Sequence, residues 1–494
     1  MADVIHQNKN LKRLIRNCII FSFIAHALCA WVVNGMYHPD ELFQILEFGG
    51  YKLGAISADH LQWEFAAHIR PALQPAMVVL VSKLTGVSFN PVHTALALRI
   101  ISSIIGWLSL TFITLIGLNW LKDDHSKRFL LYSYAFLWFL PVIQAHFSSE
   151  SLSGSLFFAG LGCVWMARNK PTNYWLMAGG FLVGLAYICR YQSALLIVGL
   201  FAWCIFIGRF GFKKLAWFLI PAALAVLAGI LIDRWFYGEW VNTAWNYFKV
   251  NIIQGKANEY GRAPVWSYFV WNFNELIPPL SIIIIAGALF ALIRFPKNSI
   301  VMSIIPFIVL HFLISHKEPR FLYPLIIAVP VLLALSYSKM QSVFHNKGKF
   351  RAWFNKLFFG LNILCLLVLL IKPRLEPFTL FDAIHENYAR KPSIMLCDRD
   401  EPYSFNGMVT WFYQPKARTY FTFLNKKKMD SIISNARMHP VLVLFNREQP
   451  ASEFYNRHPD AKLIYTNIPA WMYWFNINNW IGRTGKYTLY EMPG

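Results

Sequence analysis

The sequence predicts a polytopic α-helical membrane protein with about eleven transmembrane helices and a small soluble domain at its C-terminal end. Of the 494 residues, 56% are hydrophobic and only 14% are charged, whereas charged residues make up about 25% of ordinary soluble proteins. The mean hydropathy of +0.41 agrees with this. The composition excludes a disordered chain and argues against a soluble multidomain enzyme.

Long apolar runs give the positions of the predicted helices, because a membrane span needs about 17–20 apolar residues. The runs are 17–35, 96–119, 129–146, 152–168, 174–189, 193–208, 215–232, 276–293, 299–315, 321–337 and 356–371. No small-residue cleavage site follows the first run, so we interpret it as a retained transmembrane helix. The stretch 72–86 is apolar but short and contains Pro75, which predicts a juxtamembrane or re-entrant helix.

Basic residues orient this layout, because Lys and Arg concentrate in cytosolic loops. With the N-terminus in the cytosol, every predicted cytosolic loop is basic: 121–128, 167–173, 208–214, 294–298 and 338–356. A full span at 72–86 would invert all later loops, which argues against one. The same bias explains the formal net charge of +21. We expect no nucleic-acid partner, since no basic-aromatic patch recurs.

The chain divides by character into a multi-spanning domain over 1–371, with a large first external loop at 36–72, and a C-terminal domain over 372–494. The second part is more polar and contains four short β-like runs, at 393–397, 441–445, 462–466 and 487–492. These runs, bounded by turn-forming residues, predict a small α/β domain on the lumenal or periplasmic side.

Cysteines and acidic clusters give no sign of a metal centre. The seven cysteines include no CxxC pair, so neither a zinc site nor a disulfide framework is indicated. One D-x-D sequence, Asp398-Arg399-Asp400, lies in the C-terminal tail, and we interpret it as a solvated loop. We therefore expect no metal and no cofactor.

Polar residues converge on the predicted external face, opposite the basic loops. They come from "HPDE" (38–41), "QWEFAAHIRP" (62–71), "CRYQ" (189–192), "DRWFYGEW" (233–240) and "SHKEPRFLYP" (315–324). Charged groups at a membrane boundary are costly to desolvate and are usually functional when they face a cavity. A carboxylate can take a proton from an attacking hydroxyl, cationic side chains can hold a phosphate, and aromatic rings can stack on sugars. A sugar activated by a lipid phosphate meets all three requirements in an inverting glycosyl transfer.

Each motif alone also has a structural interpretation. Adjacent Asp and Glu after a helix often form a solvated boundary, and a lone arginine between apolar runs often reaches towards lipid headgroups. The functional interpretation rests on the shared face of these residues.

The motifs "HPDELFQ" (38–44) and "HKEPRFLYP" (316–324) resemble those of glycosyltransferase family 22, membrane mannosyltransferases of the GT-C superfamily that use dolichyl-phosphate mannose. The segments 62–75 and 233–269 are similar to two further family segments, and the match runs from about 36 to 325. Within the family, the chain most resembles the branch that adds the third mannose of the GPI core. A bacterial relative acting on another glycan is the alternative.

The resemblance implies roles for particular residues. Asp40 would be the catalytic base, with Glu41 beside it orienting or helping. His316, Lys317 and Arg320 would contact the donor phosphate. The predicted substrate-binding residues are His38, Gln44, Trp63, Glu64, Arg70, Arg190, Tyr260, His316, Lys317 and Arg320. The family is generally metal-independent.

The resulting hypothesis is an inverting mannosyltransferase that moves mannose from a polyprenyl-phosphate mannose donor to a lipid-linked glycan or GPI-type acceptor. The expected membrane is the endoplasmic reticulum in a eukaryote or the inner membrane in a bacterium. Three alternatives stay open: a GT-C transferase of another polyprenyl-phosphate sugar, a transporter or flippase of lipid-linked sugars, and a scaffold or receptor subunit without catalysis, for which Asp40 would be dispensable.

Overall fold

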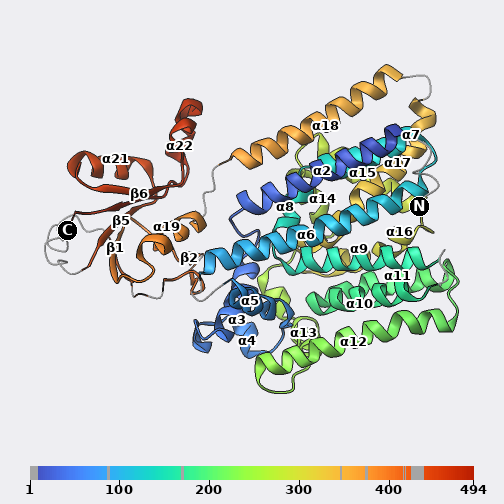
Figure 1. The fold of residues 1–494 in the computed structure, drawn as a ribbon, viewed down its shortest axis with the longest axis horizontal. Helices are drawn as coiled ribbons and strands as arrows, with labels where there is room; N and C mark the ends of the chain where they lie inside the picture. Colours follow the sequence, from blue (N-terminus) through green and yellow to red (C-terminus); the bar gives the residue numbers. More distant parts are fainter. Residues whose placement is uncertain are drawn as a thin grey trace. The chain divides into compact units, whose positions relative to one another are not determined.

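The structure, a computed structural model, describes residues 9–85, 90–168, 172–344, 348–372, 377–405, 407–415, 417, 419–423 and 439–493. Parts of two predicted cytosolic loops, 169–171 and 345–347, lie outside these residues. The chain forms two compact units (Figure 1). The helical unit comprises 1–33, 62–78 and 97–370, and the sheet unit comprises 34–61, 79–96 and 371–494. The predicted division of the chain into a multi-spanning domain over 1–371 and a C-terminal domain over 372–494 stays a prediction.

Most of the helical unit consists of apolar helices. They are α2 (Lys9–Val32), α4 (Trp63–Ala66), α5 (Leu73–Leu84), α6 (Pro91–Gly117), α7 (Asp124–Phe136), α8 (Phe139–Ala145), α9 (Ser149–Arg168), α10 (Tyr174–Cys189), α11 (Ala194–Phe206), α12 (Phe212–Tyr237), α13 (Thr243–Phe248), α14 (Ser267–Glu275), α15 (Leu280–Arg294), α16 (Ser299–Leu313), α17 (Val329–Phe344) and α18 (Gly348–Ile371). Helices α5 and α6 contribute residues to both units. Short 3₁₀ turns add Leu118–Trp120, Tyr191–Ser193, Lys256–Tyr260 and Pro319–Ala328, and a π-helical turn adds Lys249–Ile253.

Each predicted apolar run coincides with helical structure in the described residues. Among the residues that the structure describes, five helical segments are long and apolar enough to cross a membrane alone, namely Lys9–Val32, Pro91–Trp120, Phe212–Tyr237, Pro319–Met340 and Gly348–Ile371. Two bent pairs, α7 with α8 and α15 with α16, raise this number to as many as seven. The polytopic membrane character is thus confirmed, while the figure of eleven spans stays a prediction. Helix α5, at only 12 residues, has the short length expected for 72–86.

Small residues allow close helix contacts in this unit. Helix α10 packs between α9 and α12. A Cβ atom added at Gly180 of α10 would lie 2.0 Å from the carbonyl oxygen of Phe218 on α12, and one at Gly184 would lie 2.6 Å from that of Ala222. Close backbone approach at small residues stabilises helix pairs in membranes. In lipid the hydrophobic effect does not drive helices together, so van der Waals packing has to do so.

The sheet unit contains a five-stranded mixed sheet in the order β4-β1-β5-β7-β6. The strands are β1 (Ser393–Cys397), β4 (Thr419–Phe423), β5 (Val441–Phe445), β6 (Lys462–Thr466) and β7 (Thr488–Glu491), with a separate pair β2 (Ser404–Phe405) and β3 (Met408–Val409). Strands β4, β1 and β5 are parallel, and β7 is antiparallel to β5 and β6. Helices α19 (Phe378–Tyr388), α21 (Glu448–Arg457) and α22 (Trp480–Arg483) and two 3₁₀ turns (Ala470–Phe475 and Ile477–Asn479) complete this part.

All four predicted β-like runs are strands, which confirms the C-terminal α/β character. The sequence analysis did not predict β4. This strand lies at the edge of the sheet and its residues alternate between half-buried and exposed, so pairing with β1 decides its conformation more than burial does.

The sheet unit also includes part of the first external loop. This part begins with a π-helical turn (Glu41–Leu46) that continues into α3 (Glu47–Lys52), followed by a 3₁₀ turn (Ala58–His60). The fully buried carboxylate of Glu47 accepts a hydrogen bond of 2.7 Å from the backbone N–H of Trp411, 364 residues later in the chain. Tertiary contacts thus join the loop to the C-terminal segment.

Candidate active site

The acidic motif of the first loop lies where the chain enters the π-helical turn. The Nδ1 atom of His38 lies 3.2 Å from both the backbone nitrogen and the carboxylate oxygen of Asp40. Glu41 accepts a hydrogen bond of 3.0 Å from the backbone N–H of Tyr37. Asp40 is half-buried, with a quarter of its side chain (26%) exposed, and Gln44 is also half-buried. A partly exposed carboxylate beside an imidazole can take a proton from a hydroxyl.

A buried ion network occupies the helical unit, centred on Glu150 in the first turn of α9. Its carboxylate oxygen Oε1 accepts a hydrogen bond of 2.8 Å from Arg190, at the C-terminal end of α10, and one of 3.2 Å from Arg320. Arg320 also donates to Glu318 at 2.6 Å, and His316 lies 3.0 Å from the other oxygen of Glu318. Three chain segments therefore converge on one set of charges.

Arg190 retains unused donors in this network. Its Nη1 atom bonds to Glu150 and, at 3.2 Å, to the hydroxyl of Ser149. Its Nε and Nη2 atoms are buried without a hydrogen-bond partner among the described residues. The side chain is only 6% exposed, and a buried polar group without a partner is unfavourable unless a ligand satisfies it.

Lys317 and His316 extend the cationic character towards the loop between the 3₁₀ turn Lys256–Tyr260 and α14. The ammonium group of Lys317 donates to the carbonyl oxygens of Ala263, at 3.1 Å, and Ile314. Burial lowers the pKa of Lys317 because the charged form loses water. The hydrogen bond with Glu318 raises the pKa of His316, and burial acts in the opposite direction.

Aromatic and charged side chains adjoin this network through Tyr260. The indole N–H of Trp63 donates to the hydroxyl of Tyr260 at 2.7 Å, and the ring centroid of Tyr260 lies 6.3 Å from that of His316. The ammonium of Lys256 lies 5.5 Å from the ring centroid of Trp63. These residues present ring faces and a cation next to the buried charges.

Arg70 and Glu64 form the remaining part of this aromatic region. Arg70 lies 3.4 Å from the carboxylate of Glu64, and its guanidinium carbon lies 5.8 Å from the ring centroid of Tyr247. The backbone oxygen of Arg70 accepts a bond of 2.7 Å from the hydroxyl of Tyr237. Both Arg70 and Glu64 act electrostatically on Tyr260.

The structure therefore brings eight of the predicted substrate-binding residues together within the helical unit. They are Trp63, Glu64, Arg70, Arg190, Tyr260, His316, Lys317 and Arg320. The other two predicted substrate-binding residues, His38 and Gln44, and the two predicted catalytic residues, Asp40 and Glu41, lie in the sheet unit. The roles assigned to all twelve stay predictions.

Glu150 and Glu318 are not among the residues predicted from the sequence. Glu150 is the single acidic residue of "SSES" between two apolar runs, and an acid at such a boundary was the available signal. In the described part of the chain, no three or more His, Cys, Asp or Glu side chains cluster closely enough to hold a metal ion.

Several apolar spans and a buried polar network define a multi-pass integral membrane protein with charged side chains enclosed among its helices. The model of the Alg9-like mannosyltransferase family matches residues 18–397, well over half of the chain. The protein therefore belongs to this family, which is glycosyltransferase family 22, as the motifs predicted.

The chain is also similar in sequence to proteins named GPI mannosyltransferases. GPI alpha-1,2-mannosyltransferase 3 of Danio rerio is 22% identical over 329 residues, which are 66% of this chain and 60% of the relative. GPI mannosyltransferase 3 of Candida albicans is 24% identical over 337 residues, covering 66% of this chain and 64% of the relative. The matched part of this chain thus spans less than two thirds of the length of either relative.

Solved structures show a weaker likeness. ArnT from Cupriavidus metallidurans bound to undecaprenyl phosphate aligns with a TM-score of 0.44 and 10% identity, covering 95% of this chain and 97% of that protein. The Archaeoglobus fulgidus oligosaccharyltransferase complex with Zn and sulfate aligns with a TM-score of 0.46 and 13% identity, covering 90% and 69%. Likeness at this level adds nothing to the family assignment.

Proposed function

We propose that the protein is an inverting mannosyltransferase that transfers mannose from a polyprenyl-phosphate mannose to a lipid-linked glycan or GPI-type acceptor on the lumenal or periplasmic face. Membership of the Alg9-like family supports the reaction class. The names of the relatives favour a GPI-type acceptor. For a eukaryotic source, we place the protein in the endoplasmic reticulum membrane, and for a bacterial source in the inner membrane.

The observation that carries this proposal is the pair of unused buried N–H donors on Arg190. Phosphate oxygens are strong acceptors, and a guanidinium group can bind two of them in parallel. The network pairs Arg190 and Arg320 with Glu150 and Glu318, and Lys317 adds a third cation that is bonded to backbone carbonyl oxygens. Such a set carries net positive charge in a buried region and suits one added phosphate.

The proposed reaction is a single displacement. The acceptor hydroxyl oxygen forms a bond to C1 of the mannose while Asp40 takes the hydroxyl proton. The bond from C1 to the phosphate oxygen breaks, and its electron pair stays on the phosphate. Negative charge therefore grows on the phosphate during the reaction, where preorganised cations stabilise it. Trp63, Glu64, Arg70 and Tyr260 would line the cavity for the sugar.

The test uses purified full-length protein in liposomes with labelled polyprenyl-phosphate mannose and extracted membrane glycolipids. We expect unmodified protein to form a labelled glycolipid. Asp40→Asn should reduce the rate by about 10²–10⁴, the usual contribution of a general base, while donor binding persists. Retention of full activity in Asp40→Asn would exclude Asp40 as the base.

Arg190→Lys tests the phosphate site separately, because lysine keeps the charge but loses the planar fork. We expect a fall in kcat/KM of about a hundredfold, comparable to the loss of one oxyanion donor. Arg168→Gln, in the last turn of the same helix that carries Glu150 in its first turn, is the matched control and should leave the rate unchanged. Equal activity in all three proteins would refute the phosphate role of Arg190.

A further inference from the structure

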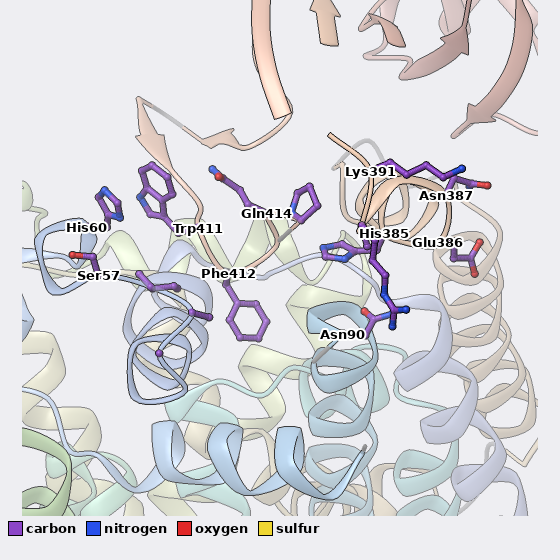
Figure 2. Close-up of a pocket in the computed structure, with 16 residues that line it drawn as sticks. Ser57, His60, Asn90, His385, Glu386, Asn387, Lys391, Trp411, Phe412 and Gln414 are labelled. Atoms are coloured by element: carbon purple, nitrogen blue, oxygen red, sulfur yellow. The ribbon is translucent and has the colours of Figure 1, made fainter. Parts of the chain in front are cut away.

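A pocket in the sheet unit has no part in the reaction described above. It has a cavity volume of about 1170 Å³, somewhat above the range of about 300–1,000 Å³ for small-molecule sites. Three stretches of the chain and one isolated residue line it: 54–57 with His60, Asn90, 385–387 with 389–391, and 411–412 with 414–415. In Figure 2, Trp411 and His60 lie on one side of the hollow, and His385 and Asn90 lie on the other.

Tertiary contacts fix the position of Trp411 and of the neighbouring Phe412 in the pocket lining. The His60 ring stacks on the Trp411 ring at a centroid distance of 3.8 Å and an angle of 8°. The carboxylate of Glu47 accepts from the Trp411 backbone N–H. A Cβ atom added at Gly50 would lie 3.3 Å from the Phe412 ring, so the backbone of α3 packs closely against Phe412, the residue next to Trp411. One face of the Trp411 indole is thus covered and its position is fixed.

The hydrogen-bonding groups of the lining have defined directions. His385 Nε2 lies 2.8 Å from the Tyr413 carbonyl oxygen, which can only accept, so Nε2 carries the proton. Burial lowers the pKa of His385, which keeps the ring neutral and leaves Nδ1 as an acceptor. The Asn90 carboxamide oxygen caps α6 by accepting from the backbone N–H groups of Val92 and His93, at 2.9 and 3.4 Å. Its NH₂ group is then the free donor end.

Gln414 contributes a hydrogen-bond acceptor, in contrast to the donor of Asn90. Its NH₂ group donates to the carbonyl oxygen of Thr410 at 3.2 Å, which leaves its own oxygen as an acceptor. Donor and acceptor ends of neutral side chains therefore occur together with an aromatic ring. Hydroxyl groups both donate and accept, and the faces of sugar rings are apolar, so this combination matches a carbohydrate better than a purely apolar or ionic ligand.

Charged side chains are a minority of the lining. Arg390 and Lys391 contribute two cations and Glu386 one carboxylate. The assignment of a hydroxyl-rich ligand therefore rests on the aromatic ring and on the neutral donor and acceptor groups, not on the charge. Trp411 and Gln414 lie beyond residue 397, where the match to the family model ends.

We infer that this pocket binds the glycan of the acceptor, with Trp411 stacking on a mannose ring and Asn90, His385 and Gln414 bonding to its hydroxyls. The inference rests on the proposed function, because it assigns the acceptor side of that reaction. The pocket would hold sugars already present on the acceptor, distant from the hydroxyl that reacts. It would thereby select acceptors by their glycan.

Two measurements on the full-length protein in detergent test this. The first is binding of a soluble α-linked dimannoside, without donor, by saturation-transfer NMR. The second is acceptor KM during mannose transfer. Removing an aromatic anchor usually weakens binding at least about tenfold. We therefore expect Trp411→Ala to abolish the dimannoside signal and to raise acceptor KM at least about tenfold, with donor KM and kcat unchanged.

Matched variants separate recognition from misfolding. Trp411→Tyr keeps an aromatic face and should restore most of the binding. Gln414→Ala leaves the ring in place and should weaken binding severalfold. Trp474→Ala removes a tryptophan of the same unit that is 86% exposed and outside the pocket, and should change nothing.

The outcomes distinguish the two proposals. Dimannoside binding that is lost in Trp411→Ala supports the pocket even if no mannose transfer is detected. Mannose transfer with unchanged acceptor KM in Trp411→Ala, together with undiminished dimannoside binding, would overturn the pocket assignment and leave the transferase proposal intact. Failure of unmodified protein to bind the dimannoside would also overturn it.

Discussion

Glu47 is expected to make the sheet unit less stable as the pH rises towards neutrality. Burial raises the pKa of its carboxyl from 4.5 to about 7, while hydrogen bonds, including that from the Trp411 N–H, act in the opposite direction. The folded chain therefore holds this proton at pH values where the unfolded chain has lost it. The stabilisation is fully present below pH 4.5 and is lost as the pH rises through 7.

The size of this effect follows from the two pKa values. Each unit of difference between the folded and unfolded pKa corresponds to about 1.4 kcal/mol. The free energy of unfolding therefore falls by roughly 3 kcal/mol between pH 4 and pH 8. Glu47→Gln has nearly the same shape but cannot ionise. It should match the unmodified protein at pH 4 and exceed it by roughly 3 kcal/mol at pH 8.

Hydrogen exchange of the Trp411 amide measures this directly, because that N–H donates to Glu47. After correction for the intrinsic exchange rate, protection in the unmodified protein should fall by about a hundredfold between pH 4 and pH 8 relative to Glu47→Gln. Glu453→Gln, an exposed carboxyl of the same unit, is the control. Parallel pH profiles for unmodified protein and Glu47→Gln would refute the reasoning.

Three further predictions concern the helical unit. Glu150→Gln leaves the buried guanidinium group of Arg190 without a carboxylate, whereas Arg320 keeps Glu318, and should destabilise the protein by about 3–5 kcal/mol, seen as a lower Tm in detergent. Gly180→Ala places a Cβ atom 2.0 Å from a carbonyl oxygen of α12 and should lower Tm and yield, whereas Gly360→Ala, with open space around it, should not. Glu318→Gln removes the main cause of the raised pKa of His316, so the decline of donor binding with rising pH should begin at lower pH.

Specific results would contradict these predictions. An unchanged Tm in Glu150→Gln would mean that the network contributes little to stability. Equal yields of Gly180→Ala and Gly360→Ala would mean that α10 and α12 separate without cost. A donor-binding profile that does not move in Glu318→Gln would show that His316 does not titrate in the binding step.

Residues of the candidate site differ in how far the sequence revealed them. His316, Lys317 and Arg320 stand out because they share one short motif. Arg190 stands out as a charge between apolar runs. Glu150 was missed because its importance depends on partners 40 and 170 positions away in the chain, and no local pattern links those positions.

The sequence by itself determined the membrane class, the positions of the helices and four of the strands, and the family. These features depend on local apolar length, residue period and short motifs, which a linear reading can measure. Only the tertiary structure decided that Glu150 joins two arginines, that Arg190 keeps buried donors unused, and that Glu47 of the first loop holds Trp411 near the C-terminal sheet. Each of these depends on burial and direction at contacts between distant segments, where the free energy of a charge or a hydrogen bond is set by surroundings that the sequence does not specify.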